Sequence, residues 1–172
     1  MELNEFKIKI SEIKNLIFRF ARRLLGSRED AEDVVQEVFI KLWKNLENLD
    51  NKKNFNAFAM TVTKNLCIDK LRTRKGKPIE FDEEIFLGSE GNLNKSIEIA
   101  DSIEFAISLI DSLPLKHKMV MHLRDIEGLE YDEIANLLGY EKNDIKVTLC
   151  RARKKIREQL TEIYEYERIE NR

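Results

Sequence analysis

Two amphipathic segments that flank a glycine, between residues 131 and 158, constrain the fold more than any other stretch of the sequence. Apolar residues recur at helical spacing before Gly139 and again after it. The repeating residues are Ile134, Ala135 and Leu138 in the first segment, and Ile145, Leu149, Ala152 and Ile156 in the second. Two helices joined by a short turn that contains glycine are typical of a helix-turn-helix. We therefore predict a small helical unit at this end of the chain.

The second of these segments is also strongly basic. Its cations are Lys146, Arg151, Arg153, Lys154, Lys155 and Arg157. A basic helix suits the major groove of DNA, because its cations contact phosphates and its long donors reach base edges. The same pattern also arises in helical bundles that bind no nucleic acid. DNA binding by this segment is therefore a hypothesis that depends on support from the rest of the chain.

The composition favours an all-α protein, since only 6 of the 172 residues are glycine and 2 are proline, and strand-like alternation is nearly absent. The net charge of −2 gives no support to nucleic-acid binding, so the distribution of charge must decide. Residues 51–78 hold 8 Lys+Arg and 1 Asp+Glu, whereas residues 79–101 hold 1 and 7. A basic patch on a neutral body still binds phosphate, because salt screens charges beyond about 10 Å.

We predict two small helical domains joined by a flexible acidic linker that contains two glycines. The three parts are an N-terminal domain at residues 1–76, the linker at residues 77–99 and a helix-turn-helix domain at residues 100–166. Apolar stripes in the first domain predict helices at about residues 3–25, 29–46 and 54–74. Gly26 suits the position after the first helix, and Ser27 with Asp30 resembles a capping box for the second.

The third predicted helix carries a face without carboxylates, in a chain that is rich in them elsewhere. The residues of this face are Thr61, Lys64, Asn65, Ile68, Arg72 and Lys75. A merely solvated Lys/Arg face would explain the pattern, but the absence of acids favours contact with phosphates. Asp69 falls on the buried side of the same helix, where we expect it to pair with a cation.

Nothing in the sequence indicates catalysis or metal binding, so we expect no enzyme, no metal and no cofactor. Cys67 and Cys150 lack the spacing of metal ligands, which favours free thiols in a reducing cytosol. His117 and His122 lie five residues apart and not four, as in a two-histidine metal site. The N-terminus lacks the apolar run of a signal peptide, and no window approaches the ~20 apolar residues of a membrane span. We therefore expect a cytoplasmic protein without membrane insertion.

Three stretches of the chain resemble the extracytoplasmic-function (ECF) type of bacterial RNA polymerase sigma factor, within the sigma-70 family. Residues 23–39, RLLGSREDAEDVVQEVF, look like the core-polymerase-binding region of that family. Residues 58–74 look like its −10-element helix, although Phe58 stands where the family usually has tryptophan. Residues 113–157, with the motifs EGL, EIA and RAR, look like its −35-element domain. The three stretches follow one another in the order and spacing of the family.

The resemblance implies a promoter-specificity factor that binds core RNA polymerase, directs it to promoters and helps to melt the −10 element. The polymerase-binding residues would be Asp33, Gln36 and Glu37. The residues facing −10 DNA would be Thr61, Lys64, Asn65, Ile68, Arg72 and Lys75, with the loop at residues 47–54 holding an unstacked base. The residues facing −35 DNA would be Lys146, Val147, Cys150 and Arg151. The implied partners are core RNA polymerase, promoter DNA and an anti-sigma factor.

Departures from the pattern of the family bear on −35 recognition. Val147 replaces a serine, which removes a hydroxyl and adds a methyl surface for a thymine, and Thr148 replaces an arginine, which removes a charge. Glu130 replaces the serine that commonly caps the first helix of the pair, and we expect the lost cap to cost about 1 kcal/mol.

Two other functions stay open: a stand-alone helix-turn-helix regulator with N-terminal dimerisation or sensing helices, and a helical adaptor whose basic faces are merely solvated.

Overall fold

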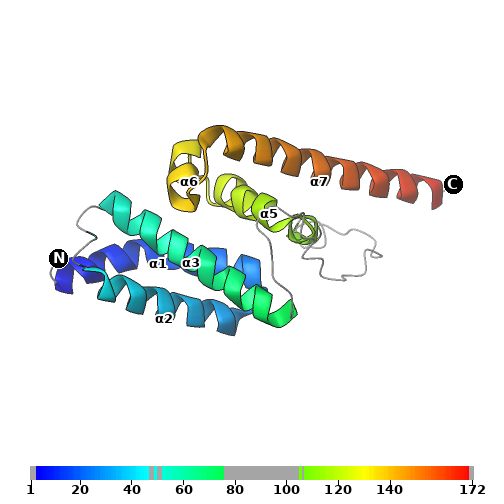
Figure 1. Ribbon diagram of the computed structural model, residues 1–172. Coiled ribbons are helices and arrows are strands. Elements are labelled where there is room, and N and C mark those ends of the chain that lie inside the picture. Colours follow the sequence, from blue (N-terminus) through cyan, green and yellow to red (C-terminus); the bar gives the residue numbers. More distant parts are fainter. Residues whose placement is uncertain (1–2, 47–48, 50–51, 76–104, 106, 171–172) are drawn as a thin grey trace.

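The computed structural model describes residues 3–46, 49, 52–75, 105 and 107–170. The described residues form helices and turns without a β-strand, which confirms the all-α prediction (Figure 1). The predicted linker at residues 77–99 and part of the loop at residues 47–54 lie outside the described residues.

Three long helices make the N-terminal unit: α1 (Leu3–Leu25), α2 (Arg28–Lys44) and α3 (Lys52–Lys75). They pack against one another in pairs and lie side by side in Figure 1. Each turns an apolar stripe inward, because residues at i, i+3 and i+4 share one face of a helix. The fully buried side chains of this unit include Ile17, Phe20, Val34, Val38, Leu42, Phe55 and Met60. The three predicted helices are confirmed, with small differences at their ends.

The turn between α1 and α2 has the chemistry that its sequence predicts. Gly26 adopts a left-handed conformation at φ 70°, where a residue with a side chain would be strained, and so ends α1. The Ser27 hydroxyl then accepts a hydrogen bond from the backbone N–H of Asp30 at 3.2 Å and caps α2. A cap of this kind stabilises a helix by about 1 kcal/mol. Because the cap sets the first residue of α2, it also sets which residues face outward along that helix.

The C-terminal unit consists of short helices followed by one long helix. Residues 107–111 are helical, and four elements follow: α5 (Leu115–Met121), the π-helical turn η2 (His122–Ile126), α6 (Tyr131–Leu138) and α7 (Lys142–Glu170). Gly139 joins α6 to α7 in a left-handed conformation at φ 72°. Ile134 and Leu138 of α6 and Ile145 and Leu149 of α7 are buried in the core. The predicted helix-turn-helix is therefore confirmed.

The predicted loss of a cap at Glu130 is wrong. The Glu133 carboxylate accepts a hydrogen bond from the backbone N–H of Glu130 at 2.8 Å, as in a capping box. The Glu130 carboxylate forms an ion pair with Arg124 at 2.9 Å. A serine is not needed at this position, because the two glutamates together accept hydrogen bonds from backbone N–H groups at the start of α6.

The two units lie against each other, an arrangement that the sequence did not predict. α1 contacts α5 and η2, and α3 contacts α6. In Figure 1, α6 is the helix of the C-terminal unit that lies next to α3. One hydrophobic core cluster contains buried residues of both units, among them Phe20 of α1 and Leu123 of η2. The position of α6 therefore decides how much of the α3 surface is exposed.

Candidate nucleic-acid interface

The outer face of α7 holds all four residues that the sequence assigns to −35 DNA. Lys146, Val147, Cys150 and Arg151 are exposed and lie on one side of the helix, at i, i+1, i+4 and i+5. Thr148 lies on the inner side, where it is only 4% exposed. Thr148, which stands in place of an arginine, therefore adds no group to the outer face of α7.

Two arginines near the helix-turn-helix have partners within the protein. Arg153 of α7 donates hydrogen bonds to both carboxylate oxygens of Asp125, at 3.2 and 2.5 Å, and these bonds raise the pKa of Arg153. The guanidinium carbon of Arg124 lies 4.7 Å from the centre of the Tyr131 ring. Lys146 Nζ lies 5.7 Å from the same ring centre. Arg153 and Arg124 thus hold η2 against the helix pair, whereas Lys146 stays exposed beside Tyr131.

The carboxylate-free face of α3 is divided by its neighbours. Its exposed residues are Asn65 and Arg72, and its half-buried residues are Thr61 and Lys64. Lys64 Nζ donates a hydrogen bond to the backbone carbonyl of Leu138, the last residue of α6, at 2.8 Å. Burial lowers the pKa of Lys64. The side chain of Lys75 lies outside the described residues. Of the described residues of this face, Asn65 and Arg72 are at the surface, whereas Lys64 is turned toward α6.

Two residues of α3 lie differently from their predicted positions. Ile68, expected to face DNA, is 2% exposed and belongs to the hydrophobic core. Asp69, expected on the buried side, is exposed and pairs with Arg72 at 3.6 Å. Because α3 packs against α6 as well as α1 and α2, more of its circumference is covered than its own apolar pattern indicates. Ile68 therefore does not lie on a surface that DNA can touch.

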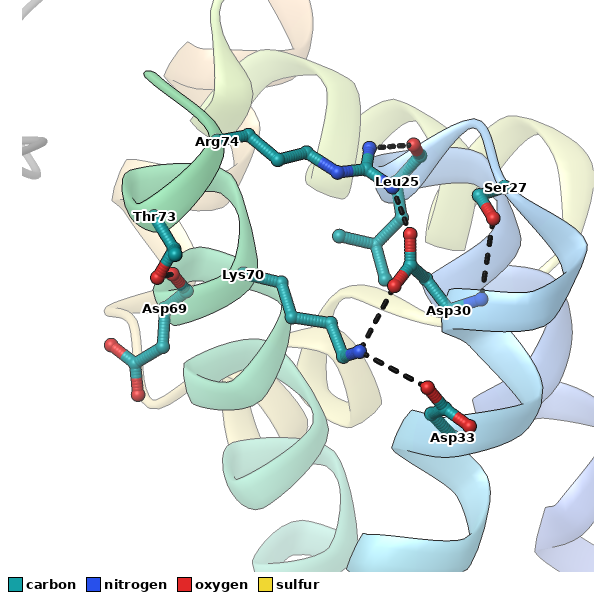
Figure 2. A network of polar contacts seen from close by, with 8 residues as sticks. All are labelled: Leu25, Ser27, Asp30, Asp33, Asp69, Lys70, Thr73 and Arg74. Atoms are coloured by element: carbon teal, nitrogen blue, oxygen red, sulfur yellow. Dashed lines mark hydrogen bonds and ion pairs between the residues drawn. The ribbon is translucent and has the colours of Figure 1, made fainter. Parts of the chain in front are cut away.

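A second set of cations on α3 serves the contact with α2 (Figure 2). Lys70 Nζ lies 2.9 Å from Asp30 Oδ1 and 3.4 Å from Asp33 Oδ2. Arg74 pairs with the other carboxylate oxygen of Asp30 and donates to the backbone carbonyl of Leu25 at 2.7 Å. We did not predict this network from the sequence. The i, i+4 spacing of Lys70 and Arg74 indicates that both cations lie on the same side of α3. These contacts hold the start of α2 against the end of α3.

The acidic side of α2 stands at the surface. Its exposed residues include Asp33, Gln36 and Glu37, the three that the sequence assigns to polymerase binding. Further along the helix, Ile40 is 55% and Trp43 48% exposed. The rings of Trp43 and Phe6 pack in a T-shaped arrangement, with their centres 5.1 Å apart. The outer side of α2 is thus acidic near its start, and toward its end it combines exposed apolar residues with the cations Lys41 and Lys44.

Both units match known sequence families. Residues 10–77 match the model of Sigma-70 region 2, and residues 106–156 match that of Sigma-70 region 4. The ECF RNA polymerase sigma factor SigW of Bacillus subtilis is 30% identical over 162 residues, which cover 87% of this chain and 86% of that protein. The chain belongs to the ECF family of RNA polymerase sigma factors. The sigma factor therefore acts in promoter-specific initiation of transcription.

Two solved structures share the fold of this sigma factor. The sigma factor RpoE of Bartonella quintana, in complex with the anti-sigma factor NepR, has a TM-score of 0.66 at 23% identity, over 92% of this chain and 98% of that chain. CnrH, in complex with the cytosolic domain of CnrY, has a TM-score of 0.68 at 22% identity, over 93% and 90%. The described helices of the sigma factor include none with the length and apolar character needed to cross a membrane.

Proposed function

We propose that the sigma factor docks on core RNA polymerase through α2, contacts and helps to open the −10 element through α3, and reads the −35 element through α7. The observation that carries this proposal is the outer face of α7, where all four predicted −35 residues are exposed shortly after the Gly139 turn. A helix presented in this way fits the major groove. We assign polymerase and −10 binding to residues 1–76, the linker to residues 77–99 and −35 binding to residues 100–166.

The proposed −35 surface mixes donors with apolar groups. Lys146 and Arg151 offer donors to phosphates and base edges, and an arginine can bond both O6 and N7 of a guanine. Val147 and Cys150 lie between these two cations on the same exposed face, and they offer apolar contact to the methyl group of a thymine. We infer that the sigma factor prefers a −35 element in which a thymine neighbours a guanine.

The proposed −10 surface begins with the two exposed residues of the carboxylate-free face of α3, Asn65 and Arg72. Taking a base out of the stack costs a few kcal/mol, which contacts with the protein must offset. An amide offers hydrogen bonds to the edge of an extruded base, and a guanidinium offers charge to the backbone and a plane for stacking. We infer that Asn65 and Arg72 make these contacts.

The proposed polymerase surface of α2 is tested by pull-down of core polymerase with the double variant Asp33→Ala and Glu37→Ala. We expect binding to weaken by about 1–3 kcal/mol, because exposed interface charges steer and orient a partner. The fold loses the ion pairs of Asp33 with Lys70 and of Glu37 with Lys41, and exposed pairs of this kind contribute about 0–1 kcal/mol each. The control, Glu158→Ala with Glu162→Ala on α7, removes the same charge elsewhere. Equal binding by both double variants would contradict this assignment.

We further propose an anti-sigma factor as a partner. Support comes from the Bartonella quintana relative in fold, whose structure holds the anti-sigma factor NepR. We place the work of the sigma factor in the cytoplasm, where polymerase meets DNA. We expect neither catalysis nor a cofactor, because its proposed role is to position DNA and polymerase relative to each other.

Run-off transcription with core RNA polymerase, with and without the sigma factor, tests the proposed function. We expect specific transcripts from a genomic template library only when both proteins are present, and weak binding of the free sigma factor to duplex DNA. The absence of any promoter-dependent transcript would contradict the proposal. Tight and specific duplex binding by the free chain, without an effect on polymerase, would identify a stand-alone helix-turn-helix regulator instead.

A further inference from the structure

The first turn of α7 is held in place from two sides. Lys142 Nζ pairs with a carboxylate oxygen of Asp132 in α6 at 2.7 Å, and Asp144 pairs with Lys116 of α5 at 2.8 Å. The next residue, Ile145, is fully buried. Figure 1 shows this end of α7 beside α6. The rest of the unit therefore sets the direction in which the start of α7 points.

Asn143 lies between the two anchored residues, and its side chain is exposed. Its side-chain amide makes no hydrogen bond with any residue in the described part of the chain. Asparagine is favoured at the position just before the first helical residue, where its side chain caps the helix. Asn143 is instead the second residue of α7. Capping therefore does not account for an asparagine at this position.

Asn143 shares one face of α7 with the residues that we assign to −35 DNA. With Asn143 as position i, the assigned residues fall at i+3, i+4, i+7 and i+8, which is the spacing of a single helical face. Side chains tilt toward the N-terminus of a helix, so Asn143 projects at the leading end of this face. The N-terminal residues of a recognition helix are those that contact base edges. Asn143 thus extends the reading face by one turn.

The surroundings of Asn143 favour contact with a base edge over contact with a phosphate. The neighbouring carboxylates of Glu141 and Asp132 are exposed, and negative charge repels the DNA backbone. The nearby cation of Lys142 is already paired with Asp132. A neutral amide, which carries a donor and an acceptor side by side, matches the major-groove edge of adenine, where N7 accepts and the N6 amino group donates. The major-groove edge of guanine offers two acceptors, so an amide could bond only one of them.

We propose that Asn143 reads an adenine of the −35 element, with Nδ2 donating to N7 and Oδ1 accepting from the N6 amino group. Residues three positions apart on a reading helix can contact successive bases, as they do in zinc fingers. The adenine therefore neighbours the base pair that Lys146 or Val147 contacts. This inference rests on the proposed role of α7 in −35 binding, and it adds a third base to the thymine and guanine inferred there.

The proposal is tested by run-off transcription with core RNA polymerase on a template library with a randomised −35 region. A downstream barcode identifies each template in the sequenced transcripts. The wild-type protein should favour adenine at one position on the order of ten-fold, which is the discrimination that a bidentate contact supplies. Asn143→Ala should lose this preference and keep those at the other positions. The control is Asn136→Ala, which removes an exposed amide from α6 and should keep every preference.

A second variant separates a lost base contact from a lost fold. Asn143→Asp keeps an acceptor for an amino group but has no donor for N7, so its preference should move from adenine toward cytosine, whose N4 amino group donates. A carboxylate in the first turn of a helix suits the helix dipole, so we expect this variant to fold. A misfolded protein would lose preferences and would not gain a new one.

Templates with 7-deazaadenine in place of each −35 adenine in turn give a second readout. This base keeps its pairing with thymine but lacks the N7 acceptor. Transcription by the wild-type protein should fall several-fold at one position, and transcription by the Asn143→Ala protein should not change there. Wild-type transcription that is equal at every replaced position, or an Asn143→Ala protein that keeps the adenine preference, would overturn this inference alone. Transcription without any dependence on the −35 sequence would overturn the proposed role of α7, and this inference with it.

Discussion

The helices α3 and α7 each carry a basic face that the sequence assigns to DNA, and the two faces differ in their exposure. On α7, all four assigned residues are at the surface. On α3, Lys64 is bonded to the end of α6 and Ile68 is buried. α7 packs on its own unit, whereas α3 contacts both its own unit and α6 of the other. Exposure of a functional face thus depends on where the rest of the chain packs, as well as on the pattern of the helix itself.

The largest expected effect comes from the buried side of α7. Leu149 is 2% exposed, so Leu149→Ala should lower the free energy of unfolding by about 2–5 kcal/mol, through lost burial and the cavity left behind. Urea denaturation followed by circular dichroism measures this change. Cys150→Ala is the matched control, because the neighbouring side chain is exposed and its removal should cost less than about 0.5 kcal/mol. Similar losses for both variants would mean that the inner and outer sides of α7 are wrongly assigned.

Acid should lower the free energy of unfolding through a buried histidine where the two units meet, a contact that involves the unit of α3. The His122 ring lies at this contact, 6.0 Å from the ring of Phe20 in α1. Burial lowers the pKa of His122 from 6.5 to about 4, with Arg23 and Arg19 acting in the same direction and Glu127 opposing them. The folded protein therefore keeps His122 neutral at a pH where the unfolded chain already binds a proton.

The sign of the resulting pH dependence follows from that difference. The contribution of neutral His122 to the free energy of unfolding is fully present above about pH 6.5 and is lost as the pH falls toward 4. Between pH 7 and 4.5 we expect a loss of about 2 kcal/mol. Glu127, whose pKa is also lowered, loses its stabilising charge at still lower pH and acts in the same direction. Urea denaturation across this range measures the loss. The His122→Gln protein should show a flatter profile, and an unchanged slope would show that His122 is not the group responsible.

On the exposed side of α7, Arg151→Ala should reduce transcription from promoters that depend on the −35 element. The expected loss is about 1–3 kcal/mol if Arg151 makes a bidentate contact with a guanine. Run-off transcription on matched templates with and without a −35 element measures it. Lys154→Ala, which removes an exposed cation about one turn beyond Arg151 on the same side of α7, should have a smaller effect. An equal loss on templates without a −35 element would indicate a folding defect and not a lost base contact.

The features predicted correctly from the sequence depend on near neighbours in the chain. The stripe of α1, the cap at Ser27 and the glycine at 139 each concern residues within one or two helical turns, so local spacing was sufficient. The bond from Lys64 to α6 joins residues far apart in sequence. No periodicity within α3 carries that information. The cap at Glu130 was missed for another reason, since glutamate at both ends of the capping box satisfies the helix without a serine.

The smallest effect concerns Val147, which is 47% exposed on the reading face of α7. Val147→Ser should change stability by less than about 0.5 kcal/mol, because its side chain is not part of the core. It should also remove an apolar contact with a thymine methyl, a contact on the order of 0.8 kcal/mol for one buried carbon group. Templates in which uracil replaces each −35 thymine in turn isolate that methyl in run-off transcription. The wild-type protein should prefer thymine to uracil at one position, and the variant should not. If the wild-type protein transcribed equally well after the replacement at every position, Val147 would contact no thymine methyl.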